Sequence, residues 1–290
     1  MIYNLPRKKR KQITNYLTFS SPNPFSISVT TPGCDGKLYC STDTKTWAEW
    51  AGSKVNAAPI GGTYVLYFRG TGNTKIAGSS SNVWTLSGSN ISCTGNIENL
   101  LDYETVEAGQ HPAMANNCYG SMFYGCTSLT TAPSLPATTL ANYCYYYMFY
   151  GCTSLTTAPS LPATTMANNC YGYMFRGCTS LTTAPSLPAT TLANNCYNSM
   201  FYGCTNLTRA PSLPATTLAN YCYYSMFYGC TSVKLAISKS SEYDKEYRIP
   251  KSGNGVTATR ALDNMFTQTG GTFTGTPEIN TTYYTSNTIV

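Results

Sequence analysis

The fold of this chain is decided by CYGSMFYGCT at residues 118–127, a stretch that returns every 26 residues. The same pattern begins again at Cys144, Cys170, Cys196 and Cys222. Each copy runs on through a Leu-Thr-x-Ala-Pro-Ser-Leu-Pro-Ala-Thr-Thr segment until the last one diverges after Cys230. A fixed period of this length is typical of a solenoid, in which each unit buries its apolar side against its neighbours.

Within the unit, five invariant positions fall on one side of a helix at about 100° per residue. In the first copy they are Cys118, Tyr119, Met122, Phe123 and Cys126. The glycine before the second cysteine stands where a left-handed C-terminal cap is expected, which predicts a helix of about two to three turns.

A short extended stretch follows, Leu129-Thr130-Thr131-Ala132. Pro133 then lacks a backbone donor, which limits how far parallel strand pairing between units can continue. The unit therefore predicts a mixed α/β solenoid, leucine-rich-repeat-like, with one short strand and one short helix per 26-residue turn.

The opposite side of the predicted helix takes the positions that vary between copies, equivalent to 117, 120, 121 and 124. These twenty positions hold Tyr, Asn, Ser, Gly and one Arg, which are the residue types of adaptable binding surfaces, and no Lys, Glu or Gln. Recent duplication with little drift is the alternative explanation. The predicted binding residues are Tyr143, Tyr146, Tyr147, Tyr150, Tyr173, Arg176, Tyr221, Tyr224 and Tyr228.

The run MFYGCTSL at residues 122–129 and its four copies, the last ending in Val233, resemble the signature of the BspA-type leucine-rich repeats. The resemblance covers somewhat under half of the chain. It implies a repeat fold, and it implies a cell-surface or phage-associated binding protein without a shared chemistry.

Residues 15–95 carry short alternating or aromatic runs broken by Gly, Pro and Ser, which predicts a small β-sandwich. Core packing is favoured over glycan stacking for Trp47, Trp50 and Trp84. The strands predicted in this region are Tyr16–Phe19, Phe25–Val29, Leu38–Ser41, Thr46–Trp50, Thr63–Arg69 and Val83–Leu86.

The solenoid is predicted over residues 96–238. A C-terminal cap or tail is predicted over residues 239–290, with a closing helix at residues 262–266.

Residues 1–14, ahead of the predicted β-sandwich, are predicted to form a basic N-terminal docking tail. Its docking residues Arg7, Lys8, Lys9, Arg10 and Lys11 supply +5 of the net charge of +6. A nuclear-localisation or nucleic-acid arm is the other interpretation, but such runs are usually interaction tails. No apolar run is long enough to span a membrane or to act as a standard secretion signal.

Catalytic chemistry has few candidate groups here. Residues 108–241 hold no Asp or Glu, and His111 is the sole histidine, interpreted as a loop residue. We therefore expect no enzyme activity, no cofactor and no metal site. The thirteen cysteines fit buried reduced thiols better than disulfides, and the C-x7-C spacing does not suit common zinc sites, although bridges between units stay open.

Three functions fit these features. The first is a bacteriophage virion component (a fibre, decoration or receptor-binding protein) made in the host cytoplasm, with the basic segment bound to other virion proteins and the repeats facing a host-surface glycan or protein. The second is a bacterial cell-surface adhesin, and the third is a purely structural spacer. Membrane insertion and nucleic-acid binding are not expected, while a homo-oligomer is open.

Overall fold

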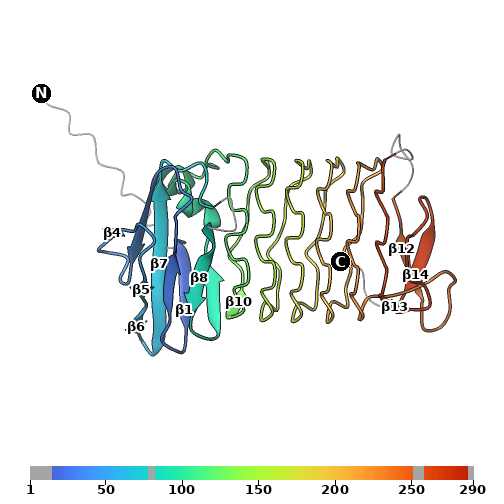
Figure 1. Ribbon diagram of the computed structural model, residues 1–290, viewed down its shortest axis with the longest axis horizontal. Helices are drawn as coiled ribbons and strands as arrows, with labels where there is room; N and C mark the ends of the chain where they lie inside the picture. Colours follow the sequence, from blue (N-terminus) through green and yellow to red (C-terminus); the bar gives the residue numbers. More distant parts are fainter. Residues whose placement is uncertain (1–14, 78–81, 251–257, 287–290) are drawn as a thin grey trace, which may run out of the picture.

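The computed structural model describes residues 15–77, 82–250 and 258–286. Figure 1 shows the coils of the repeat array side by side along the long axis, with the N-terminal strands at one end and a small C-terminal sheet at the other. One continuous set of buried apolar side chains runs through all three parts. Among the described residues, no helix has the length and apolar character needed to cross a bilayer.

Two sheets make up the N-terminal region, and all six strands predicted there are confirmed. The larger contains β9 (Ile91–Thr94), β1 (Leu17–Ser21), β7 (Thr63–Thr71), β3 (Lys37–Ser41) and β4 (Ala48–Glu49) in that spatial order, with β6 (Ala58–Ile60) paired to β7. The smaller contains β5 (Val55–Asn56), β2 (Ser26–Val29) and β8 (Trp84–Ser87). The sequence patterns missed β5, β6 and β9, of which β5 has only two residues.

Aromatic side chains from both sheets meet in the N-terminal core. The ring of Phe68 lies 5.0 Å from Trp84 and 4.9 Å from Trp50, and all three side chains are buried. Core packing is thus confirmed for Trp50 and Trp84. Trp47 is half-buried, and its ring lies 4.9 Å from that of Tyr16, so it packs locally beside the β3–β4 hairpin instead of in the core.

The N-terminal region continues directly into the repeats. Strand β10 (Leu129–Thr131) of the first unit pairs in parallel with β9, and the 3-10 helix η2 (Ile97–Leu100) and helix α1 (Tyr103–Glu107) lie between them in sequence. The amide of Trp84 donates to the carbonyl of Met122 at 2.8 Å, and that of Ile76 donates to Cys118 at 2.8 Å. These bonds cover carbonyl groups that the first coil would otherwise expose at the open end of the solenoid.

The predicted helix in each unit is wrong. Residues 117–126 form a run of linked β-turns, in which alternate amides donate to the carbonyl three residues back, as from Met122 to Tyr119 at 3.1 Å and from Tyr124 to Ser121 at 3.0 Å. Every fourth residue has a left-handed backbone: Asn117 at φ 61°, Ser121 at φ 60° and Gly125 at φ 70°. Turns with a positive φ at their third residue are of type II, and they alternate with type I turns. We call this run the turn ribbon.

The remaining amides explain why the ribbon is stable without helical bonds. Those of Tyr119, Ser121 and Phe123 donate to residues 144, 146 and 148 of the next coil at 2.8 to 3.0 Å. Asn117 and Gly125 make the same bond with residues 142 and 150. Nine of the ten backbone amides of residues 117–126 therefore donate a hydrogen bond, four of them inside the coil and five between coils.

The ribbon directs side chains in pairs, two inward and two outward, with a period of four. A helix face with positions i, i+1, i+4, i+5 and i+8 produces nearly the same in-and-out pattern over nine residues, so the inward set was predicted correctly from an incorrect backbone. All five inward residues of the first copy are buried.

Identical inward residues stack on one another along the solenoid. Tyr119, Tyr145 and their three successors are spaced 5.5 to 5.9 Å apart. The phenylalanine column is spaced 5.4 to 5.7 Å and ends on Phe266. The thiol of Cys178 donates to the carbonyl of Phe149 in the preceding coil at 3.1 Å, and the equivalent cysteines do the same. All thirteen cysteines are free thiols, in agreement with the reduced form predicted.

The rest of each unit holds little regular strand. After β10, the coils are joined by single parallel bridges, such as Thr131 to Thr157 and Thr183 to Arg209. An asparagine ladder supports the entry to each ribbon: the amide of Asn142 donates to Oδ1 of Asn116 at 3.2 Å, and the pattern repeats up to Asn220. The proline after each short extended stretch lacks an amide donor, which explains why the parallel hydrogen bonds between coils do not continue further.

A sixth turn ribbon closes the array, where a helix at 262–266 was predicted. The amides of Tyr223 and Phe227 donate to the carbonyls of Ala261 and Met265. Left-handed backbone recurs every four residues in this ribbon, at Arg260, Asn264 and Gln268. Beyond it lies a sheet of β12 (Lys245–Arg248), β14 (Thr282–Thr285), β11 (Lys234–Ala236) and β13 (Gly270–Gly271).

The ribbon backbone makes a direct prediction for two glycines of one coil. Gly125 has φ 70° and open space around an added Cβ, so Gly125→Ala is expected to cost about 1 to 2 kcal/mol of unfolding free energy through backbone strain alone. Gly120 has no such φ and ordinary contacts of 3.4 to 3.7 Å around an added Cβ, so Gly120→Ala is the matched control with no loss. Denaturant unfolding of both variants measures the difference, and equal stabilities would contradict the left-handed assignment.

Candidate binding surface

The variable positions form the outward side of the turn ribbons, as predicted, although on a different backbone. Tyr143 is 38% exposed, and the other eight predicted binding residues are half-buried. Ser121, Ser199 and Ser225 are buried because neighbouring side chains cover their small hydroxyls. The outward side is therefore a surface of tyrosine rings with small residues between them.

Six tyrosines from the first three coils form one network of ring contacts. Tyr147 contacts Tyr146 at 4.3 Å and Tyr173 at 4.7 Å between ring centroids. Tyr143 packs edge-on against Tyr146 at 5.3 Å. Tyr124 and Tyr150 complete the set, which brings together five of the predicted binding residues.

A column of side chains, one from each coil, continues this network along the solenoid. We call it the tyrosine column: Tyr124, Tyr150, Arg176, Tyr202 and Tyr228. Tyr124 and Tyr150 stack at 4.6 Å with nearly parallel rings, as do Tyr202 and Tyr228. The guanidinium of Arg176 lies between the two pairs, 4.0 Å from the Tyr202 ring and 5.8 Å from the Tyr150 ring. The sequence prediction missed Tyr124 and Tyr202, which their 26-residue spacing from Tyr150 and Tyr228 could have indicated.

Tyr221 and Tyr224 lie on the last full coil and contact each other at 5.7 Å. Arg260 of the sixth ribbon stacks over both rings, at 5.6 and 4.9 Å. Its Nε donates to Asp263 at 2.8 Å, which pairs its charge within the protein. No sequence pattern pointed to Arg260, because its ribbon lacks the cysteine-tyrosine opening of the repeats.

Several of these tyrosines occupy a backbone conformation that disfavours them. Tyr143, Tyr147, Tyr173 and Tyr221 have φ between 54° and 59°, at positions where other copies place Asn or Ser. A left-handed backbone costs roughly 1 to 2 kcal/mol for a residue with a Cβ, and Asn tolerates it best. Neutral drift would favour Asn, so repeated tyrosine at these positions supports a role for the side chain.

Gly172 gives the network its local shape. A Cβ at this position would lie 3.0 Å from two carbons of the Tyr146 ring, so the ring rests over the glycine backbone. Burial raises the pKa of Tyr146 above its ordinary value, because the ionised phenolate would lose hydration in this packed position. Tyr146 is therefore neutral and able to donate or accept a hydrogen bond across the whole physiological range.

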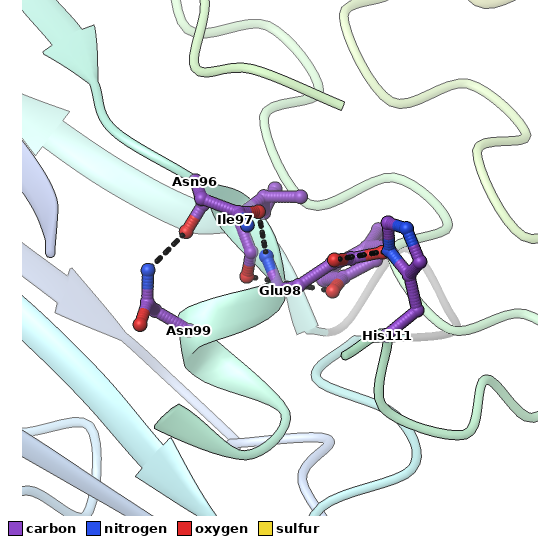
Figure 2. Close-up of polar contacts among 6 residues, drawn as sticks. Asn96, Ile97, Glu98, Asn99 and His111 are labelled. Carbon is purple, nitrogen blue, oxygen red and sulfur yellow. Dashed lines mark hydrogen bonds and ion pairs between the residues drawn. The ribbon is translucent and has the colours of Figure 1, made fainter. Parts of the chain in front are cut away.

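A second candidate is the recess beside Glu98 and His111, with a volume of about 280 Å³. Figure 2 shows the polar contacts of these two side chains. The Glu98 carboxylate is 2% exposed, and both of its oxygens lie 2.8 to 3.0 Å from Nδ1 of His111. The amide of Glu98 donates to Oδ1 of Asn96 at 2.9 Å, and Asn99 donates to the Asn96 carbonyl at 3.1 Å. These bonds hold the carboxylate at the entry to the repeats. No sequence pattern links Glu98 to His111, which lies thirteen positions further along the chain.

This pair anchors the loop at 111 to the first coil. Within the described residues, Glu98 is the sole hydrogen-bond partner of His111, and no group of three His, Cys, Asp or Glu side chains is placed to hold a metal ion. The docking residues Arg7, Lys8, Lys9, Arg10 and Lys11 lie outside the described residues. The tyrosine-rich outward side is accordingly the principal candidate site.

Comparison with protein families agrees with the repeat geometry. Residues 112–234 match the model described as BspA type leucine rich repeat region, in six copies. This segment is a BspA-type leucine-rich repeat array. The resemblance predicted from MFYGCTSL is confirmed, although the model counts six copies where the 26-residue period gives five. Comparisons with curated proteins and with solved structures found no match.

The match describes the repeat architecture of residues 112–234. Its units carry turn ribbons, and the Met-Phe and Cys positions that are invariant between the copies point inward. The family resemblance thus rests on the inward residues, while the outward residues differ between the copies of this chain.

Proposed function

We propose that this protein is a non-enzymatic binding protein that attaches to a surface ligand through the outward tyrosines of its BspA-type array. The observation that supports this most strongly is the set of four tyrosines held at positive φ, a conformation that Asn tolerates better. Tyrosine, serine, asparagine and glycine are also the residues of adaptable paratopes. The proposal assigns no catalytic residue and no cofactor.

We further propose that the protein is a component of a bacteriophage particle, with the basic run Arg7–Lys11 bound to another virion protein and the array directed toward a host-surface glycan or protein. The low charged fraction of 10% is typical of extracellular and virion surfaces. A bacterial surface adhesin of the same repeat family is the second candidate, because the BspA-type match suits it equally. Mass spectrometry of purified particles separates the two, since only the first predicts the protein there.

The binding proposal is tested by changing Tyr146, Tyr147, Tyr173 and Arg176 together to Ser. Serine occupies the positions equivalent to Tyr147 and Tyr173 in other coils, as Ser121 and Ser199, so the fold is expected to persist. Binding of the purified protein to host cells is expected to fall at least about tenfold, which corresponds to about 1.4 kcal/mol.

The matched control is the pair Asn206→Ser and Arg209→Ser, on exposed positions of the strand side. This control is expected to bind as the unchanged protein does. Unchanged binding by the quadruple variant, with its thermal unfolding intact, would instead support the third candidate, a structural spacer.

A further inference from the structure

Arg176 is the arginine of the repeat array that stacks among tyrosine rings, and it has no ion pair in the described part of the chain. Arg69 in the N-terminal region also stacks on aromatic rings without an ion pair, but its Nε is buried. Its guanidinium contacts three tyrosine rings, at 4.0 Å for Tyr202, 5.7 Å for Tyr173 and 5.8 Å for Tyr150. The described residues offer it no ion pair, and residues 108–241 contain no Asp or Glu. Arg260 makes a similar stack but pairs with Asp263.

Stacking among the tyrosine rings makes the Arg176 guanidinium well suited to bind an anion. Rings on both faces of the planar guanidinium restrict the side chain, while its N–H groups point away from the ring faces, along the guanidinium plane. A restricted guanidinium loses less conformational entropy when it binds a carboxylate in the bidentate geometry. The array therefore holds one preorganised, unpaired positive charge in the middle of its outward side.

The stacked tyrosines next to Arg176 favour the same kind of ligand. Tyr124 and Tyr150 cover each other's faces at 4.6 Å, as do Tyr202 and Tyr228, which leaves ring edges and phenol hydroxyls for a partner. Ring edges carry the positive part of the aromatic quadrupole. A row of edges and hydroxyls therefore suits a partner rich in oxygen atoms.

Charge density distinguishes between anionic polymers. A nucleic acid carries one phosphate per nucleotide, and its binding proteins neutralise several of them with Lys and Arg. The tyrosine column supplies one cation over five coils. This fits a chain of mostly neutral, hydroxylated units with a carboxylate at intervals.

We propose that the tyrosine column binds a carboxylate-bearing polysaccharide that runs along the solenoid axis, with one carboxylate on Arg176 and sugar hydroxyls on the phenols of the neighbouring coils. This rests on the proposed binding function and specifies its ligand class. Successive side chains of the column repeat with the spacing of the coils, so a polymer of regular units contacts equivalent groups from coil to coil.

The test uses isothermal titration calorimetry with hyaluronan oligosaccharides and with partly methyl-esterified oligogalacturonate, two acids whose carboxylates are separated by neutral units. Each is compared with its fully methyl-esterified form, which keeps the chain and removes the charge. The unchanged protein is expected to bind at least one acid saturably and the matching ester about tenfold more weakly. Arg176→Gln is expected to weaken binding of the acid about tenfold and to leave binding of the ester unaltered. Arg209→Gln removes an arginine away from the column and is expected to bind as the unchanged protein does.

Absence of saturable binding to both acids overturns the ligand assignment, as does an Arg176→Gln variant that binds like the unchanged protein. Equal losses in the Arg176 and Arg209 variants would reveal nonspecific charge attraction and overturn it too. If the acid and ester bind alike while the quadruple serine variant still loses host-cell binding, the surface function stands and the anionic ligand is wrong. A protein partner is indicated if host-cell binding depends on Arg176 but survives enzymatic removal of surface polysaccharide, which also overturns the assignment.

Discussion

This protein is expected to unfold cooperatively as the pH rises above about 9, although it is stable at neutral pH. The cause is the set of ten buried thiols of the repeats. Burial raises the pKa of Cys126, Cys170, Cys204 and Cys222 to about 12. It also raises the pKa of Cys118, Cys144, Cys152, Cys178, Cys196 and Cys230.

The sign follows from proton binding. In the unfolded chain these thiols ionise from about pH 8.5, whereas the folded solenoid keeps them protonated up to about pH 12. The folded state therefore binds more protons in this window, and stability falls as the pH rises. Each thiol contributes about 2 kcal/mol of lost stability at pH 10, so ten together exceed the roughly 5 to 15 kcal/mol of a typical domain.

Circular dichroism recorded together with thiolate absorbance, in the presence of a reductant, measures the transition. Both signals are expected to change at the same pH. High salt screens general surface repulsion but leaves thiol burial unaffected, so the transition is expected to persist there. The double variant Cys152→Ala and Cys178→Ala is expected to show a pH slope shallower by about two of the ten protons. Thiolate absorbance that develops near pH 9 while the fold is intact would contradict a sealed interior.

Phe175→Ala is expected to destabilise the protein by roughly 3 to 5 kcal/mol, which is a large fraction of its total stability. The Phe175 side chain is fully buried and stacks on Phe149 at 5.6 Å and Phe201 at 5.7 Å. Its removal leaves a cavity that weakens two coil interfaces at once. In a solenoid, stability is approximately a sum of such nearest-neighbour terms, so the loss falls in the middle of the array.

Tyr173→Ser is the matched control, two residues away on the outward side. Serine removes the ring contact with Tyr147 but suits the left-handed backbone, which Ser199 and Ser225 adopt at the equivalent positions. A change within about 1 kcal/mol is expected. Guanidinium unfolding of both variants measures the difference. Similar losses in the two would mean that the inward and outward sides are not distinguished as the structure shows.

The cysteine thiols also explain a feature that hydrophobicity alone does not. Each second cysteine of a unit donates from Sγ to a carbonyl of the preceding coil at 2.9 to 3.1 Å, and Cys126 reaches Trp84 in this way. Alanine or valine would fill part of the space but could not donate. The thiol combines a small apolar volume with a weak donor, which fits a position between stacked backbones.

The pairing of Glu98 with His111 could not be predicted from the sequence. His111 looks like an isolated loop residue, and Glu98 looks like one of several scattered acids. Only the return of the chain after α1 brings Nδ1 of His111 within 2.8 Å of the buried carboxylate. No spacing rule connects the two positions, so their pairing depends on the path of the whole loop.

The sequence by itself determined the repeat period, the family and the inward set, because apolar residues recur at the same places in every copy and must be buried. It also indicated the outward tyrosines. The tertiary structure decided the backbone, since the amides of Tyr119 and Phe123 bond to the next coil and no bond of this kind is visible within one unit. Asn117, Ser121 and Gly125, four residues apart and each tolerant of left-handed φ to some degree, were the local sign of it. The unpaired charge of Arg176 likewise became visible only when stacking placed it between Tyr150 and Tyr202, because a side chain's partners depend on the neighbouring coils.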